Sequence, residues 1–176
     1  SPVARCFELA DGSADCGPCP EGYHGGISET FSSGDYSDGP YGGWSIVDDG
    51  DIDAPSSWSE EAGTIVQSSN IGGDVDLALD GSYALGGDTA WTDYSLRARL
   101  KNLDDDGIGL IFRHRDEGSY YRFVLRRETG EARLVKRLEG AAEILWSSDA
   151  SGTYEVGEWF ELEVALEGSS ITISRD

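Results

Sequence analysis

Three consecutive stretches decide the fold: Tyr-Ser-Leu-Arg-Ala-Arg-Leu-Lys at residues 94–101, Ile-Gly-Leu-Ile-Phe-Arg-His-Arg at 108–115 and Tyr-Tyr-Arg-Phe-Val-Leu-Arg at 120–126. In each stretch apolar and polar side chains alternate, which is the period of a β-strand with one buried face. Turn-forming Asp, Gly and Ser residues separate them. These stretches therefore predict antiparallel strands that follow one another in the chain.

Short runs of the same kind continue on both sides of this segment. We predict strands at residues 44–47, 64–68, 82–85, 94–101, 108–114, 120–126, 132–137, 143–146, 159–166 and 171–174. Long helical patterns are absent, and Gly, Asp and Ser break the runs at short intervals. This cadence predicts an all-β chain, folded as an antiparallel two-sheet β-sandwich of jelly-roll type.

The first 26 residues differ from the rest in composition. They are small, polar and rich in turn residues, and they contain all three cysteines: Cys6, Cys16 and Cys19. So short a segment cannot form a core without cross-links. We expect residues 1–26 to form a cysteine-containing appendage and residues 27–176 to form the sandwich. Disulfide candidates crowded in this way indicate a secreted or cell-surface protein.

The charge is strongly negative and unevenly distributed. Acidic residues number 34 against 13 basic ones, for a formal net charge of -21, which disfavours nucleic acid or an anionic membrane as a partner. No apolar run is long enough to span a membrane. Most of the basic residues lie between Arg97 and Arg137.

If the strands at 94–101, 108–114 and 120–126 are neighbours, one sheet face carries a basic group of candidate ligand-binding residues: Arg97, Arg99, Arg113, Arg115, Tyr120, Arg122 and Arg126. We predict that this face binds a glycan, and an anionic saccharide is one candidate ligand. The alternative is that these arginines only pair with acidic residues across the sheet, such as Glu128, Glu131 and Glu163.

Aspartate runs interrupted by glycine predict calcium binding. Ca²⁺ takes six to eight oxygen ligands, and such runs supply carboxylates and carbonyls in little sequence. The candidate ligands are Asp35 and Asp38, then Asp48, Asp49, Asp51 and Asp53, then Asp104, Asp105 and Asp106. The alternative is ordinary turn-forming aspartate.

Catalysis has a weaker basis in the sequence. His114 shares its parity with Phe112, so we expect a core or sheet-end histidine, and the other histidine, His24, lies in the appendage. A polysaccharide lyase could be built from Arg113, His114, Tyr120 and Tyr121, but the sequence phrases of such enzymes are missing, so we predict a non-catalytic module. Of the five tryptophans, Trp58 and Trp91 lie in loop contexts and are our candidates for stacking on sugar rings.

Two stretches resemble the thrombospondins. Cys6, nine further residues and then Cys-Gly-Pro-Cys-Pro-Glu-Gly-Tyr at 16–23 resemble the second half of the epidermal-growth-factor-like repeat of that family. Asp-Asp-Asp-Gly-Ile-Gly at 104–109, with Trp-Ser-Ile-Val at 44–47, Gly-Thr-Ile-Val-Gln at 63–67 and Tyr-Tyr-Arg-Phe at 120–123, is similar to its C-terminal lectin-like domain. More loosely, these phrases are similar to laminin-G and concanavalin-like domains.

The resemblance implies a concanavalin-like jelly roll that binds calcium and engages a glycan, the extracellular matrix or a cell-surface protein. It also implies closing strands that are missing after residue 174, which leaves an open sheet edge for a partner strand. We therefore expect a secreted calcium-binding adhesion or recognition module. The alternatives are a polysaccharide-processing enzyme or its carbohydrate-binding accessory module, and a structural domain completed by a partner strand.

Overall fold

The computed structural model describes residues 31, 43–50, 52–72, 81–148 and 153–176, together with the backbone of Phe7–Glu8 and Ala14–Asp15. Every regular element in these ranges is a β-strand, and all strand pairs are antiparallel. A helix with the length and apolarity needed to cross a membrane does not occur among them. The predicted all-β class is confirmed.

The chain divides into two compact units, each assembled from separate stretches. The first consists of Ser1–Val47, Ser56–Ser69 and Ala84–Gly87, and the second of Asp48–Pro55, Asn70–Tyr83 and Asp88–Asp176. Two pairs of short strands are β1 (Phe7–Glu8) with β2 (Ala14–Asp15) and β3 (Ser45–Asp48) with β6 (Ser82–Leu85).

A β-hairpin in the first unit joins β4 (Trp58–Glu61) to β5 (Thr64–Gln67). Its two turn residues, Ala62 and Gly63, both have positive φ angles, 51° and 77°, as a type I′ turn requires. The sequence predicted β5 but missed β4, because Trp-Ser-Glu-Glu contains one apolar residue and so shows no alternation.

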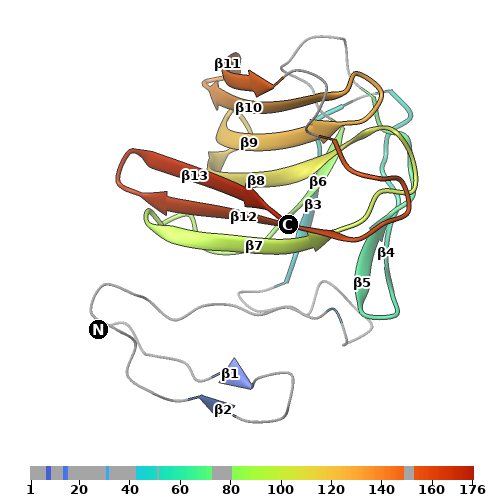
Figure 1. The fold of residues 1–176 in the computed structure, drawn as a ribbon, viewed down its shortest axis with the longest axis horizontal. Coiled ribbons are helices and arrows are strands. Elements are labelled where there is room, and N and C mark those ends of the chain that lie inside the picture. Colours follow the sequence, from blue (N-terminus) through green and yellow to red (C-terminus); the bar gives the residue numbers. More distant parts are fainter. Residues whose placement is uncertain are drawn as a thin grey trace. The chain divides into compact units, whose positions relative to one another are not determined.

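The second unit contains the sandwich (Figure 1). Its four-stranded sheet has the order β11-β10-β9-β8, formed by β8 (Gly107–Asp116), β9 (Ser119–Arg126), β10 (Glu131–Leu138) and β11 (Ala141–Ser148). Its three-stranded sheet has the order β13-β12-β7, formed by β7 (Tyr94–Leu100), β12 (Phe160–Glu167) and β13 (Ser170–Arg175). The chain thus leaves one sheet after β7, runs through four successive strands of the other, and returns to pair β12 with β7.

The core lies between these two sheets. Phe112, Phe123 and Leu125 from the four-stranded sheet form one buried cluster with Leu162 and Val164 from the three-stranded sheet. Leu162 and Val164 are completely buried, and burial of such side chains contributes about 2 kcal/mol each. Because one cluster draws on both inner faces, the sheets pack face to face, and the predicted two-sheet sandwich is confirmed.

The strand order corrects the predicted arginine face. Strands β8 and β9 are neighbours, but β7 pairs with β12 in the other sheet. Arg97 and Arg99 on β7 therefore belong to a different sheet from Arg122 and Arg126 on β9. The prediction of a single basic face was wrong because alternation shows which side chains share a face of one strand, not which strands share a sheet.

A bulge in β8 corrects a second expectation. The register with β9 shifts between Phe112 and Asp116, and Arg113 within this interval has a φ of 50°. Phe112 stacks on Tyr121 with ring centroids 6.0 Å apart, whereas His114 stacks on Tyr120 at 5.8 Å. Since consecutive residues of β9 face opposite sides, the bulge sends His114 away from the core face. Its predicted shared parity with Phe112 was wrong.

The same pair of strands approaches closely at Gly109. A Cβ atom built on Gly109 would overlap the carbonyl oxygen of Phe123 on β9. This position therefore requires glycine for space.

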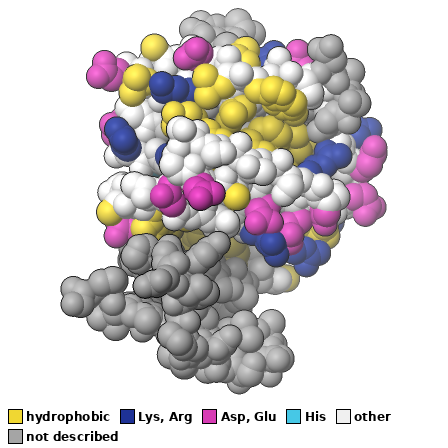
Figure 2. Space-filling model, turned by 60° about the vertical axis from the view of Figure 1, so that its left-hand side comes forward, with side chains coloured by type: hydrophobic (Ala, Val, Ile, Leu, Met, Phe, Trp, Pro, Cys, Tyr) yellow, Lys and Arg dark blue, Asp and Glu magenta, His cyan; other side chains and the backbone are white. Residues whose placement is uncertain are grey.

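Strand β11 forms an apolar edge of the four-stranded sheet. Ile144, Leu145 and Trp146 are 40%, 43% and 50% exposed, although Trp146 also contacts the core residue Phe123, with ring centroids 6.3 Å apart. Leu138 at the end of β10 is 49% exposed. Hydrophobic side chains gather into one patch on the upper part of the face displayed in Figure 2.

Candidate functional site

The two outer faces of the sandwich differ in accessibility. On the four-stranded sheet, Tyr120, Arg122 and Val135 are only 2%, 5% and 1% exposed, although register places them on the side opposite the core. On the three-stranded sheet, the Arg97 side chain is 61% exposed. The outer face of the three-stranded sheet is therefore the open one, and we call it the β7–β12–β13 face.

Register determines which side chains this face presents. Arg97 lies opposite Glu163, Arg99 opposite Glu161, and Ala165 opposite Thr172. The remaining alternate positions belong to the same face because side chains alternate along each strand. The members are Ser95, Arg97 and Arg99 from β7, Glu161, Glu163 and Ala165 from β12, and Ser170, Thr172 and Ser174 from β13. Short side chains thus lie beside charged ones on this face.

Arg97 is neutralised by two carboxylates. Its Nη2 lies 2.8 Å from Glu163 Oε2, and its Nε lies 3.4 Å from Glu161 Oε1. The hydrogen bond and charge of Glu163, with the charge of Glu161, raise the pKa of Arg97. This part of the face therefore offers donors and acceptors with little net positive charge.

An exposed tryptophan lies at one end of the face. Trp159 directly precedes β12 and is 46% exposed. The Arg99 guanidinium carbon lies 5.4 Å from the centroid of its ring and the Lys101 ammonium nitrogen 5.8 Å from it. Neither cation forms an ion pair with any carboxylate in the part of the chain that the structure describes. We call these three residues the Trp159 corner.

Trp58 and Trp91, the tryptophans predicted to stack on sugar rings, are not exposed as Trp159 is. Trp58 lies in β4, half-buried, and its Nε1 donates to Ser56 Oγ at 3.0 Å. Trp91 packs against Tyr94 with ring centroids 5.9 Å apart. The signal for Trp159 was its parity: it alternates with half-buried Phe160 and buried Leu162, which pack into the core, and so belongs with the outward Glu161.

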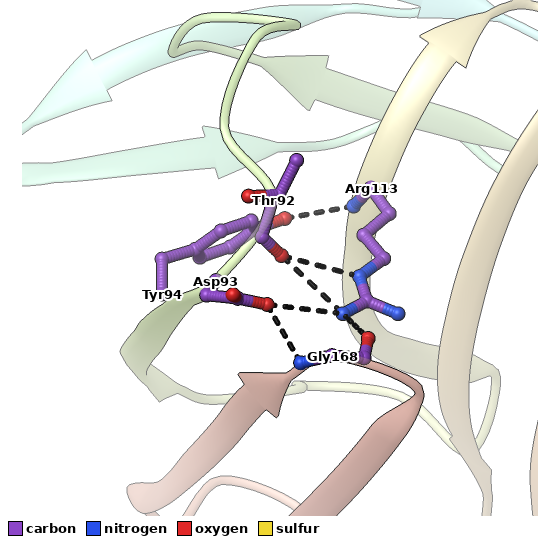
Figure 3. Close-up of polar contacts among 5 residues, drawn as sticks. All are labelled: Thr92, Asp93, Tyr94, Arg113 and Gly168. Carbon is purple, nitrogen blue, oxygen red and sulfur yellow. Dashed lines mark hydrogen bonds and ion pairs between the residues drawn. The ribbon is translucent and has the colours of Figure 1, made fainter. Parts of the chain in front are cut away.

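Arg113 joins the two sheets (Figure 3). Its Nη2 donates to the carbonyl of Gly168 at 2.5 Å and of Thr92 at 3.3 Å, and lies 3.8 Å from Asp93 Oδ1. Its backbone N–H donates to Tyr94 Oη at 2.7 Å. The guanidinium is thus engaged by the segment leading into β7 and by the β12–β13 turn, which indicates a structural role.

The other predicted ligand-binding residues are dispersed. Arg115 is exposed near the end of β8, Arg122 is buried, and Arg126 is half-buried. Arg126 lies opposite Gly107 on one side and Glu131 on the other. The structure does not bring these side chains to the β7–β12–β13 face.

Asp49 belongs to a buried polar cluster. Its Oδ2 accepts a hydrogen bond from Tyr120 Oη at 2.8 Å and lies 2.5 Å from Arg137 Nη1. The side chains of Arg137 and Asp49 are 12% and 11% exposed. Burial alone would lower the pKa of Arg137, but its hydrogen bonds to Asp49 and Tyr120 raise it. Asp49, predicted as a calcium ligand, thus has two protein partners for one carboxylate oxygen.

His114 and Tyr83 lie beside this cluster. Their nearest polar atoms, His114 Nε2 and Tyr83 Oη, are 3.4 Å apart, and His114 Nδ1 has no hydrogen-bond partner among the described residues. Burial lowers the pKa of His114, opposed by Asp116 and Glu117, and burial raises that of Tyr83. His114 is therefore neutral near pH 7.

The lyase set considered from the sequence does not converge. Tyr120 and Tyr121 lie on opposite sides of β9, where Tyr121 stacks on core residue Phe112. Arg113 is engaged between the sheets, away from the ring of His114, which stacks on Tyr120.

The loop at Asp104–Asp106 is organised by Tyr154 and Asn102. The Tyr154 hydroxyl lies 3.0 Å from the carbonyl oxygen of Asp104 and also donates to that of Asp106. Asn102 Nδ2 donates to Tyr154 Oη at 2.9 Å and to the Asp106 carbonyl at 3.2 Å. All three aspartates are exposed, and burial followed by the charges of Asp104 and Asp105 raises the pKa of Asp106.

A cluster of three His, Cys, Asp or Glu side chains able to hold a metal is not found within the described ranges. Asp48 and Asp53 are both exposed there. Asp35, Asp38 and Asp51, and the disulfide candidates Cys6, Cys16 and Cys19, lie outside the described residues. Calcium binding and the cysteine pairing stay predictions.

Comparisons with known proteins bear on the fold. No family model and no curated protein matches the chain. Among solved structures it is similar to "carbohydrate binding module CBM66 from Bacillus subtilis", with 18% sequence identity and a TM-score of 0.57, over 76% of this chain and 73% of that one. At this low sequence identity, the structural similarity supports the β-sandwich fold alone. The resemblance to thrombospondins stays a prediction.

Proposed function

We propose that this chain is a carbohydrate-binding module that holds an extended saccharide against the β7–β12–β13 face. The observation that carries the proposal is that this outer face is open, with an exposed tryptophan at its end. Sugar hydroxyls need paired donors and acceptors, and the apolar side of a sugar ring packs on aromatic surface. The solved structure with a similar fold is named as a carbohydrate-binding module, which supports the proposal.

The dimensions of the face suit a chain of several sugar rings. β12 has 8 residues, and at about 3.3 Å per residue it extends over roughly 26 Å. Hydroxyl-bearing Thr172 and Ser174 lie on one side of its carboxylates and Arg97 on the other. A saccharide along β12 would therefore meet donors and acceptors on both sides.

The test is binding to a panel of soluble polysaccharides, measured by affinity electrophoresis and then by calorimetry. Trp159→Ala should weaken binding to every ligand found by about fivefold to tenfold, because stacking on one aromatic ring contributes on the order of 1–1.5 kcal/mol. Trp146→Ala is the matched control, because Trp146 is equally exposed at 50% but lies on the other sheet. Equal effects of the two substitutions, or no binding across the panel, would contradict the proposal.

A narrower form of the same proposal is a secreted, calcium-stabilised module that adheres to glycans of the extracellular matrix or cell surface. Its support is the net charge of -21 and the Asp-Gly runs, since bound divalent cations relieve repulsion among clustered carboxylates. The module would serve recognition, either alone or as the accessory of a polysaccharide-processing enzyme. Capture of a partner strand at an open sheet edge stays a prediction.

A further inference from the structure

We infer that the saccharide is acidic, and that its carboxylate or sulfate group binds Arg99 and Lys101 at the Trp159 corner. This inference rests on the proposed function and adds the chemical class of the ligand. Along β7 and the residue that follows it, Arg97 is paired with two carboxylates, whereas Arg99 and Lys101 have no carboxylate partner among the described residues.

The two unpaired cations are held close together. Arg99 and Lys101 are two positions apart and both lie near the ring of Trp159, at 5.4 and 5.8 Å from its centroid. Their like charges repel, and the electron-rich ring face offsets part of this repulsion. An anionic group placed between a guanidinium and an ammonium would offset the rest, because charge-assisted hydrogen bonds to such donors are the strong ones.

The surroundings limit where an acidic group can bind. Glu161 and Glu163 occupy the neighbouring positions of β12 and are engaged by Arg97, so an anion placed over them would be repelled. The chain as a whole carries a net charge of -21, which disfavours non-specific binding of polyanions. An acidic saccharide that binds this protein therefore needs a local positive site, and the Trp159 corner is such a site.

The experiment compares saccharides that differ only in charge. One pair is polygalacturonate and its methyl ester, which tests a carboxylate, and the other is dextran sulfate and dextran, which tests a sulfate. We expect the charged member of at least one pair to bind about tenfold more tightly, since two exposed charge pairs contribute up to about fivefold each. Raising the salt concentration should reduce this preference.

Matched variants locate the effect. Arg99→Ala with Lys101→Ala should abolish the preference for the charged member, whereas Arg99→Lys with Lys101→Arg keeps both charges and should retain it. Lys136→Gln on β10, in the other sheet, removes one positive charge and should change nothing. Arg99 and Lys101 are exposed, and Lys136→Gln is conservative in size. Melting temperatures will show that each of the three variants is folded.

The outcomes separate the inference from the proposed function. Equal binding of charged and neutral members, unaffected by Arg99→Ala with Lys101→Ala, overturns the inference and leaves carbohydrate binding intact. A preference that survives the double alanine variant also overturns it, because the anion then binds elsewhere. Absence of binding to all four polysaccharides overturns both. Loss of the preference only in the double alanine variant supports the inference and shows which anionic group is recognised.

Discussion

Replacing Asp49 by alanine tests the buried polar cluster most directly. The substitution leaves Arg137 12% exposed with its nearest carboxylate removed, and Tyr120 loses an acceptor 2.8 Å away. Breaking a buried ion pair by removal of one partner costs about 3–5 kcal/mol, because an uncompensated charge stays behind. The pair retains some solvent contact, so we expect Asp49→Ala to lower the free energy of unfolding by about 3 kcal/mol.

Urea unfolding followed by tryptophan fluorescence measures this loss, and a double-mutant cycle assigns it. In Arg137→Met the charge is replaced by an apolar side chain of similar length. Asp49→Ala combined with Arg137→Met should therefore cost less than Asp49→Ala alone, because no buried charge is left unpaired. Tyr120→Phe should cost about 1–2 kcal/mol through the lost hydrogen bond to a charged partner.

Two results would refute this reasoning. One is a loss of less than about 1 kcal/mol for Asp49→Ala, a value typical of an exposed pair. The other is additivity of the two substitutions, which would mean that Asp49 and Arg137 do not interact in solution.

Three further predictions concern metal, pH and packing. Calcium should raise the melting temperature and a chelator should lower it, and Asn substitution throughout Asp104–Asp106 should remove the difference; an unchanged wild-type melt would count against calcium. The pKa of His114 is lowered in the folded state, so the unfolded state binds more protons at mildly acidic pH. Stability should therefore fall as the pH drops through about 6.5. His114→Gln should remove this component of the stability–pH profile, while His24→Gln should leave it. Gly109→Ala should cost more than about 3 kcal/mol in urea unfolding, since its Cβ would overlap backbone. Gly157 has a φ of 82° and open space around it, so Gly157→Ala should cost about 1–2 kcal/mol. Similar losses for the two variants would argue against the close approach of β8 and β9 at Gly109.

The strands of the sandwich were predictable because burial on one side imposes alternation. Tyr94–Leu100 and Phe160–Glu167 show it clearly, and both are strands in the structure. Their pairing was not predictable, because alternation is a property of each strand separately and does not depend on the neighbour. β4 was missed because its strand lacks one-sided burial: three of its four residues are half-buried. Its sequence therefore shows no alternation of apolar and polar residues.

The candidate site was predicted only in part. Arg97 and Arg99 were chosen correctly as outward residues of their strand, while Arg113 was expected beside them and instead ties the sheets together. The cause is local: an irregular residue with positive φ inside a strand reverses the parity of those that follow. Nothing in Arg-His-Arg distinguishes a bulge from a regular strand. Trp159 could have been predicted as an outward residue from its parity, which it shares with Glu161. Its hydrophobicity alone indicates a core residue.

The apolar edge strand β11 has a consequence for how copies of this protein behave at high concentration. Among the described residues β11 has no strand on its outer side, and such an edge with Ile144 and Trp146 invites strand pairing between molecules. A net charge of -21 on each molecule repels them. The repulsion acts over about 10 Å at 0.1 M salt and about 3 Å at 1 M, while contact between apolar edges is insensitive to screening. Colloidal stability should therefore be greatest in dilute buffer, and salt should promote self-association.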